Sequence, residues 1–77
     1  MKIFIQPADT KRFTIDMAED ATIGHMKEEI IKHTNIKQRN QSLYFDSKQL
    51  DDDDRFISDY NIHKESILSL FTKKTGG

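Results

Sequence analysis

Apolar and polar residues alternate with a period of two in the first part of the chain. Two rows share this spacing, one formed by Met1, Ile3 and Ile5 and the other by Phe13, Ile15 and Met17. Such rows are typical of half-buried strands, and the turn residues between positions 7 and 11 predict that the strands form a hairpin. The loop contains no glycine, so we expect Asp9 or Thr10 to adopt a positive φ, which aspartate tolerates better.

The apolar spacing then changes to that of a helix. A single stripe at i, i+3, i+7 and i+8 consists of Ile23, Met26, Ile30 and Ile31. Thr22 precedes the stripe and can cap the helix through its hydroxyl group. Asn35 follows it and can end the helix in the left-handed conformation. We therefore predict one helix of about a dozen residues between these two positions.

The second half of the chain predicts three further strands. Residues 43–45 and 48–50 form short strands on either side of an Asp46-Ser47 turn, and residues 67–71 form the closing strand. The closing strand has an inner face with Leu68 and Leu70 and an outer face with Ile67, Ser69 and Phe71. Strands segregated from one long helix predict an α+β fold, in which a mixed sheet of four to five strands packs on that helix.

The chain length and these patterns predict one globular domain over residues 1–72, followed by a flexible tail over residues 73–77 that ends in Gly-Gly. A chain this short buries only about 60% of its unfolded surface, so its core is thin. The predicted core consists of Met1, Ile3, Ile5, Phe13, Ile15, Met17, Ile23, Met26, Ile30, Leu43, Phe45, Leu50, Ile57, Ile62, Leu68 and Leu70.

Composition restricts the classes of partner. Twelve basic residues nearly balance thirteen acidic ones, which argues against a nucleic-acid binder and against a membrane-surface binder. No segment approaches the roughly 20 apolar residues of a membrane span, and the N-terminus lacks the pattern of a secretory signal. The chain has no cysteine, which removes thiolate chemistry and fits a reducing compartment. We expect a cytoplasmic or nuclear location.

Four segments resemble the ubiquitin family: "MKIFI", "SKQL", "SDYNIHKES" and the terminal "TGG". The resemblance covers the whole chain with under half of the positions identical, and one extra residue within 51–54 keeps the register. It implies a ubiquitin-like β-grasp roll. It also implies a modifier that activating, conjugating and ligase enzymes join through Gly77, escorted by Gly76, to lysines of target proteins, and that deconjugating proteases release.

In this interpretation the chain is a substrate with no active site and no cofactor of its own. An alternative stays open. The chain would then be a non-conjugated ubiquitin-like domain of a larger protein, acting as a binding module for ubiquitin receptors or the proteasome. A terminal Gly-Gly alone does not separate these two hypotheses.

The chain departs from the family on the surface that the family uses for recognition. That surface is aliphatic, with Leu, Ile and Val at positions that correspond to Ala8, Tyr44 and Phe71 here, and Ser69 replaces a histidine beside them. If their strands are neighbours, the two aromatic rings can meet across the sheet. An exposed aromatic pair is a candidate partner-binding surface, and the alternative is a pair that only shields the sheet.

The tail and the lysines give further candidate residues. The resemblance assigns recognition by an activating enzyme to Lys73, Lys74 and Thr75, where the family has arginine at the first and third positions. Lysine does not replace the planar fork of arginine, so a dedicated enzyme is plausible. Two lysines are a weak signal for nucleic acid. Candidate chain-linkage lysines are Lys11, Lys27, Lys48 and Lys64, each of which the simpler interpretation makes a solvated surface residue.

A metal site is not expected. His25 and Glu29 share one face of the predicted helix but lack a third ligand. The acidic run Asp51–Asp54 lacks the glycine and glutamate of a calcium loop, and we expect it to be a solvated loop. With no enzyme, metal or nucleic-acid signal in the sequence, we expect a monomer that acts through contacts with other proteins.

Overall fold

The two alternating rows form the predicted hairpin in the computed structural model, which describes residues 1–73. β1 (Lys2–Pro7) pairs with β2 (Phe13–Asp16) in antiparallel orientation, and Ile3 lies opposite Ile15. β1 ends one residue later than predicted, because Pro7 pairs with the closing strand and does not belong to the turn. A proline is tolerated there because the end of a strand can do without its N–H group.

The expected positive φ in the β1–β2 loop is wrong. Within residues 1–73, positive φ angles occur at Asn35, Asp46, Ser47, Asn61 and Glu65, and neither Asp9 nor Thr10 is among them. The loop between Pro7 and Phe13 is longer than a tight two-residue hairpin turn, so it can reverse the chain without a left-handed residue.

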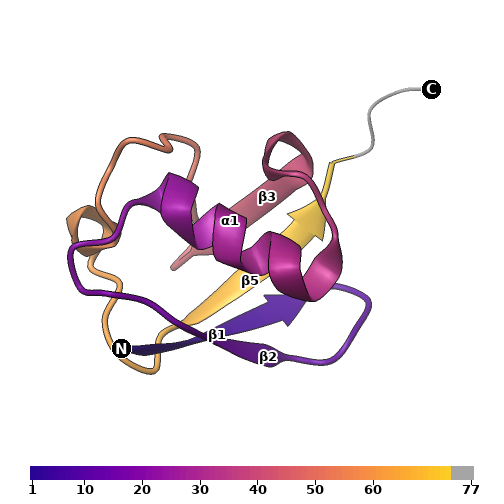
Figure 1. Ribbon diagram of the computed structural model, residues 1–77, viewed down its shortest axis with the longest axis horizontal. Helices are drawn as coiled ribbons and strands as arrows, with labels where there is room; N and C mark the ends of the chain where they lie inside the picture. Colours follow the sequence, from indigo (N-terminus) through magenta and orange to yellow (C-terminus); the bar gives the residue numbers. More distant parts are fainter. Residues whose placement is uncertain (74–77) are drawn as a thin grey trace.

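The closing strand occupies the middle of a five-stranded mixed sheet. The strand order is β2-β1-β5-β3-β4, where β3 is Gln41–Phe45, β4 is Lys48–Gln49 and β5 is Ile67–Thr72. β5 runs parallel to β1 and antiparallel to β3, as Figure 1 shows. The turn between β3 and β4 has two positive φ angles, which gives the tight reversal that a two-residue hairpin needs.

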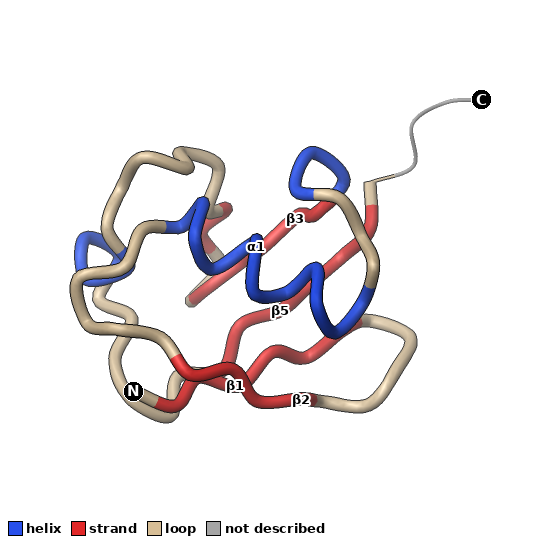
Figure 2. Tube along the Cα trace, viewed as in Figure 1, coloured by secondary structure: helices blue, strands red, loops and turns tan. Residues whose placement is uncertain are grey.

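The helix has the bounds and caps that the sequence predicts. α1 (Ile23–Thr34) begins after Thr22, whose Oγ1 accepts a hydrogen bond of 3.1 Å from the His25 N–H. It ends at Asn35, which has a φ of 61° and donates its backbone N–H to the Ile31 carbonyl. α1 crosses one face of the sheet (Figure 2). Two short 3-10 helices, η1 (Gln38–Asn40) and η2 (Ile57–Tyr60), complete the described chain.

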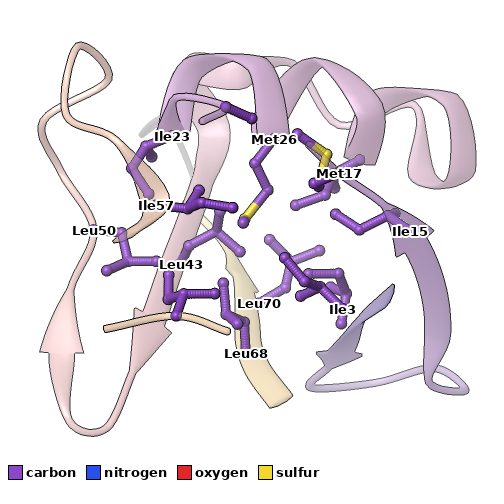
Figure 3. Close-up of a cluster of buried hydrophobic side chains, with 14 residues drawn as sticks. Ile3, Ile15, Met17, Ile23, Met26, Leu43, Leu50, Ile57, Leu68 and Leu70 are labelled. Atoms are coloured by element: carbon purple, nitrogen blue, oxygen red, sulfur yellow. The ribbon is translucent and has the colours of Figure 1, made fainter. Parts of the chain in front are cut away.

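The core lies between α1 and the inner face of the sheet (Figure 3). Of the predicted core residues, Met1, Phe13 and Phe45 are only partly buried against it, and the others are buried. Ala21 was missed, because a lone small residue in a loop has no periodicity. The buried apolar residues are Ile3, Ile5, Ile15, Met17, Ala21, Ile23, Met26, Ile30, Leu43, Leu50, Ile57, Ile62, Leu68 and Leu70.

The acidic run is attached to the helix. The Lys27 side chain, 8% exposed, places its Nζ 2.8 Å from Oδ1 of Asp53. The Gly24 N–H donates to the Asp53 carbonyl at 2.9 Å, and a Cβ at Gly24 would lie only 3.2 Å from that oxygen. Residues 51–54 are exposed, as the prediction of a solvated loop requires. The sequence analysis did not predict that Asp53 contacts Lys27 and Gly24 of the helix. No helix described in residues 1–73 is both long enough and apolar enough to span a membrane.

Candidate partner-binding surface

The alternation of β5 places three of its side chains on the outer face of the sheet, away from α1. Ile67 and Phe71 are 47% and 48% exposed, and Ser69 between them is half-buried. Leu68 and Leu70 point the other way and are buried. One strand thus supplies both the centre of the core and the centre of an exposed face, as the sequence predicts.

The two predicted aromatic rings meet on this face. Tyr44 lies directly opposite Ser69, and Phe71 lies opposite Ser42, so the aromatic residues are diagonal neighbours on β3 and β5. Their ring centroids are 5.8 Å apart and their planes meet at 82°, an edge-to-face arrangement that aromatic pairs favour. The predicted contact is confirmed, whereas its role in partner binding remains a prediction.

Ala8 lies beside the same end of β5. Its backbone N–H donates to the Leu70 carbonyl at 3.1 Å, and its side chain is exposed. We call Ala8, Tyr44, Ser69 and Phe71 the outer-face cluster. Gln49 on β4 donates to the Ser42 hydroxyl at 3.4 Å and adds polar groups at the edge. An aromatic centre with a polar border is typical of a protein–protein interface.

The structure adds a second apolar pair that the sequence analysis did not single out. Phe4 on β1 pairs with Ile67 at the start of β5, and Phe71 lies at the other end of that strand. The Lys2 Nζ and Arg12 Cζ atoms lie 6.0 and 5.8 Å from the Phe4 ring centroid. Alternation alone places Phe4 and Ile67 on the outer face. Their contact could not be predicted in this way, because it depends on the parallel pairing of two strands that are far apart in the sequence.

The tail begins at the same end of β5 as the outer-face cluster. Lys73 is exposed, and its backbone N–H donates to the Asn40 carbonyl at 2.7 Å. The other predicted tail residues, Lys74, Thr75, Gly76 and Gly77, lie outside the described residues. The structure therefore brings together Ala8, Tyr44, Ser69 and Phe71. Lys73, the first residue of the predicted recognition segment, follows Phe71 by two positions.

Glu29, one of the two helix residues considered as metal ligands, has another partner. Lys32 donates a hydrogen bond of 2.9 Å to Glu29, and this bond lowers the pKa of the Glu29 carboxyl group. Over residues 1–73, no three His, Cys, Asp or Glu side chains gather closely enough to hold a metal ion.

The four candidate linkage lysines differ in accessibility. Lys11, Lys48 and Lys64 are exposed, whereas Lys27 is buried and paired with Asp53. An amine must be accessible to attack an acyl group, and the Lys27 amine is buried and held by Asp53. This placement counts against Lys27 as an acceptor.

We predict that N-hydroxysuccinimidyl acetate modifies Lys27 at least about tenfold more slowly than Lys48, because Lys27 must first leave its ion pair. Mass spectrometry of peptides at increasing reaction times measures both rates. Asp53→Ala should raise the rate at Lys27 and leave that at Lys48 unchanged. Equal rates in the unaltered protein would contradict the buried position of Lys27.

Known proteins with similar sequences carry ubiquitin-like names. Ubiquitin-like protein 4A-B of Salmo salar is 32% identical over 76 residues, which cover 99% of this chain and 50% of that protein. Ubiquitin-like protein 4A of Rattus norvegicus is 32% identical over 73 residues, which cover 95% of this chain and 46% of that protein. The chain spans about half the length of the curated relatives it matches.

A family comparison covers nearly the whole chain. The sequence model of the Ubiquitin family matches residues 3–75, which include all the helices and strands apart from the first residue of β1. The five-stranded mixed sheet with one helix is the ubiquitin-like β-grasp arrangement that the sequence predicts. The match and the fold together show that the chain belongs to the ubiquitin family.

Proposed function

We propose that this chain is a ubiquitin-like modifier, which is joined through the Gly77 carboxyl group to lysine amines of target proteins. The observation that carries the proposal is the Gly76-Gly77 pair, which begins four positions after β5 in the sequence of a chain that belongs to the ubiquitin family. The central position of β5 also supports the proposal. Because β5 is paired on both sides, the segment that follows it starts from a strand held by two neighbours.

The chemistry of conjugation belongs to the partner enzymes. As the family resemblance implies, the Gly77 carboxylate is adenylated with ATP, passes as a thioester between enzyme cysteines and ends as an amide on a target amine. Residues without a Cβ enter a narrow channel more easily than bulky ones. Lys73, Lys74 and Thr75 would contact the activating enzyme, and Lys73 is exposed as that role needs. The reaction would take place in the cytoplasm or nucleus.

The outer-face cluster would contact the enzymes, receptors and deconjugating proteases. Its support is the half-exposed Phe71 ring packed edge-to-face against Tyr44, since aromatic residues are favoured at interface centres. With 48% of Phe71 exposed, part of this residue remains accessible to a partner.

The second candidate function is a non-conjugated domain that binds ubiquitin receptors or the proteasome. The lengths of the relatives favour it, because the matching segment forms only about half of each ubiquitin-like protein 4A. In that case the Gly77 carbonyl would belong to a peptide bond, and the outer-face cluster would act alone.

We expect the chain that ends at Gly77 to form a thioester with an activating enzyme of its source organism in the presence of ATP. A non-reducing gel should show the adduct, and a thiol reductant should remove it. Gly76→Val, which adds a branched side chain to the glycine pair, should reduce the adduct by at least about tenfold. Absence of the adduct with every activating enzyme of that organism would contradict conjugation and favour the domain hypothesis.

We also expect domains that recognise the aliphatic surface of ubiquitin to bind this chain weakly, because Tyr44 and Phe71 place rings where the family has smaller side chains. Titration of such a domain into isotope-labelled protein measures the affinity. A Tyr44→Ile and Phe71→Val double variant should bind at least about tenfold more tightly. Affinity of the unaltered chain equal to that of ubiquitin would refute the selective role of the rings.

A further inference from the structure

A groove of about 860 Å³ lies at the end of the molecule where β5 finishes. Three segments form its walls: the loop from β1 to β2, the residues around the C-terminal end of α1, and the last residues of β5. Figure 2 shows these segments gathered at the same end, although they are far apart in the sequence. The groove volume falls in the range of roughly 300–1,000 Å³ that is usual for binding pockets.

Hydrogen bonds and stacking fix the walls of the groove. The Gln6 side chain donates to the Thr10 carbonyl at 3.2 Å, which holds the loop. On the helix side, the Thr34 hydroxyl donates to the Ile30 carbonyl at 2.9 Å. The His33 ring stacks on Phe13 with centroids 4.6 Å apart and an angle of 17°, which joins the end of α1 to β2. The groove therefore exists before any partner binds, which lowers the entropic cost of binding.

Apolar side chains line part of the groove. Phe13 and Ile36 are partly buried against the core, and Leu70 is 2% exposed. Phe71 lines the groove and also belongs to the outer-face cluster. The groove is thus continuous with an exposed aromatic surface and can take a chain segment that extends beyond it.

The charges of the groove are mostly positive. Lys11 and Arg12 line it, and Asp9 is the one carboxylate among its lining residues. The Arg12 Nε donates to the Gln6 side chain at 3.3 Å and its Cζ lies 5.8 Å from the Phe4 ring centroid, so the guanidinium lies on the β1 side of the groove. Neither Lys11 nor Arg12 forms an ion pair with a residue in the range 1–73. Neither cation is therefore neutralised by a carboxylate of the described residues.

We propose that this groove binds an acidic peptide segment of a partner protein, with one apolar side chain against Phe13 and Ile36 and with carboxylates beside Lys11 and Arg12. The excess of cations over carboxylates favours an anionic occupant. The apolar lining favours a peptide over a nucleic acid, whose phosphates would gain little from Leu70 and Ile36. The site is separate from the Gly77 chemistry, and it does not depend on conjugation.

Selection from a display library of random peptides against the full chain tests the proposal. The enriched peptides should carry several Asp or Glu residues and at least one apolar residue, and their affinity should fall as NaCl is added. The most enriched peptide, labelled with a fluorophore, then serves as the probe. Lys11→Glu with Arg12→Glu should weaken its binding by at least about tenfold, as expected for reversal of two contacting charges.

Lys37→Glu with Arg39→Glu is the matched control, because it makes the same charge change at exposed residues outside the groove. It should alter the affinity by no more than about twofold. Asp9→Asn should strengthen binding without any charge reversal, and it keeps the proposal testable if the Lys11 and Arg12 variant does not fold.

Any one of four results would overturn the proposal. Enriched peptides without an excess of acidic residues would remove its chemical basis. Equal weakening by the two double variants would show that only overall charge matters. No strengthening by Asp9→Asn would show that the carboxylates of the peptide do not lie beside Asp9. A poly(dT) oligonucleotide that shifts the amide resonances of Lys11 and Arg12, where the acidic peptides do not, would assign the groove to nucleic acid. A failure of thioester formation at Gly77 would leave all these readouts unchanged.

Discussion

The position of β5 in the middle of the sheet is the constraint on which the rest of the structure depends. β1 pairs with it in parallel and β3 in antiparallel orientation, so its backbone is bonded on both sides. A strand held in this way must send alternate side chains to opposite faces. Leu68 and Leu70 therefore enter the core under α1, and Ser69 and Phe71 must face outward.

The same constraint places both candidate binding regions. Phe71 meets Tyr44 on the outer face and also lines the groove beside the β1–β2 loop. Ala8 belongs to both regions too, so they share two residues. The chain leaves β5 at Thr72 and is bonded once more, from Lys73 to Asn40. A partner that recognises the residues after β5 can therefore also contact the aromatic pair of the outer face and the apolar and cationic residues of the groove, which lie near the end of β5.

Much of the fold follows from local patterns in the sequence. Thr22 and Asn35 bound the helix as expected, because a cap and a left-handed residue are recognisable from their side chains. The alternation in β5 likewise predicted which of its residues face outward. These features depend on residues within a few positions of one another, where propensity and spacing decide the conformation.

What the sequence did not predict depends on contacts between distant residues. Pro7 belongs to β1 because β5 pairs with it, and Lys27 is buried because Asp53 reaches it. The groove needs α1, β2 and β5 to meet, and the stacking of His33 on Phe13 links positions that no local pattern connects. Pairing of Phe4 with Ile67 was missed for the same reason.

The most direct test of the central role of β5 compares two adjacent residues of that strand by urea unfolding. Leu70→Ala should lower the free energy of unfolding by about 2–5 kcal/mol, as for other fully buried leucines. Phe71→Ala should lower it by about 1 kcal/mol or less, because the ring is half-exposed and packs mainly on Tyr44. Equal losses, or a larger loss for Phe71→Ala, would contradict the division of β5 into a core face and a binding face.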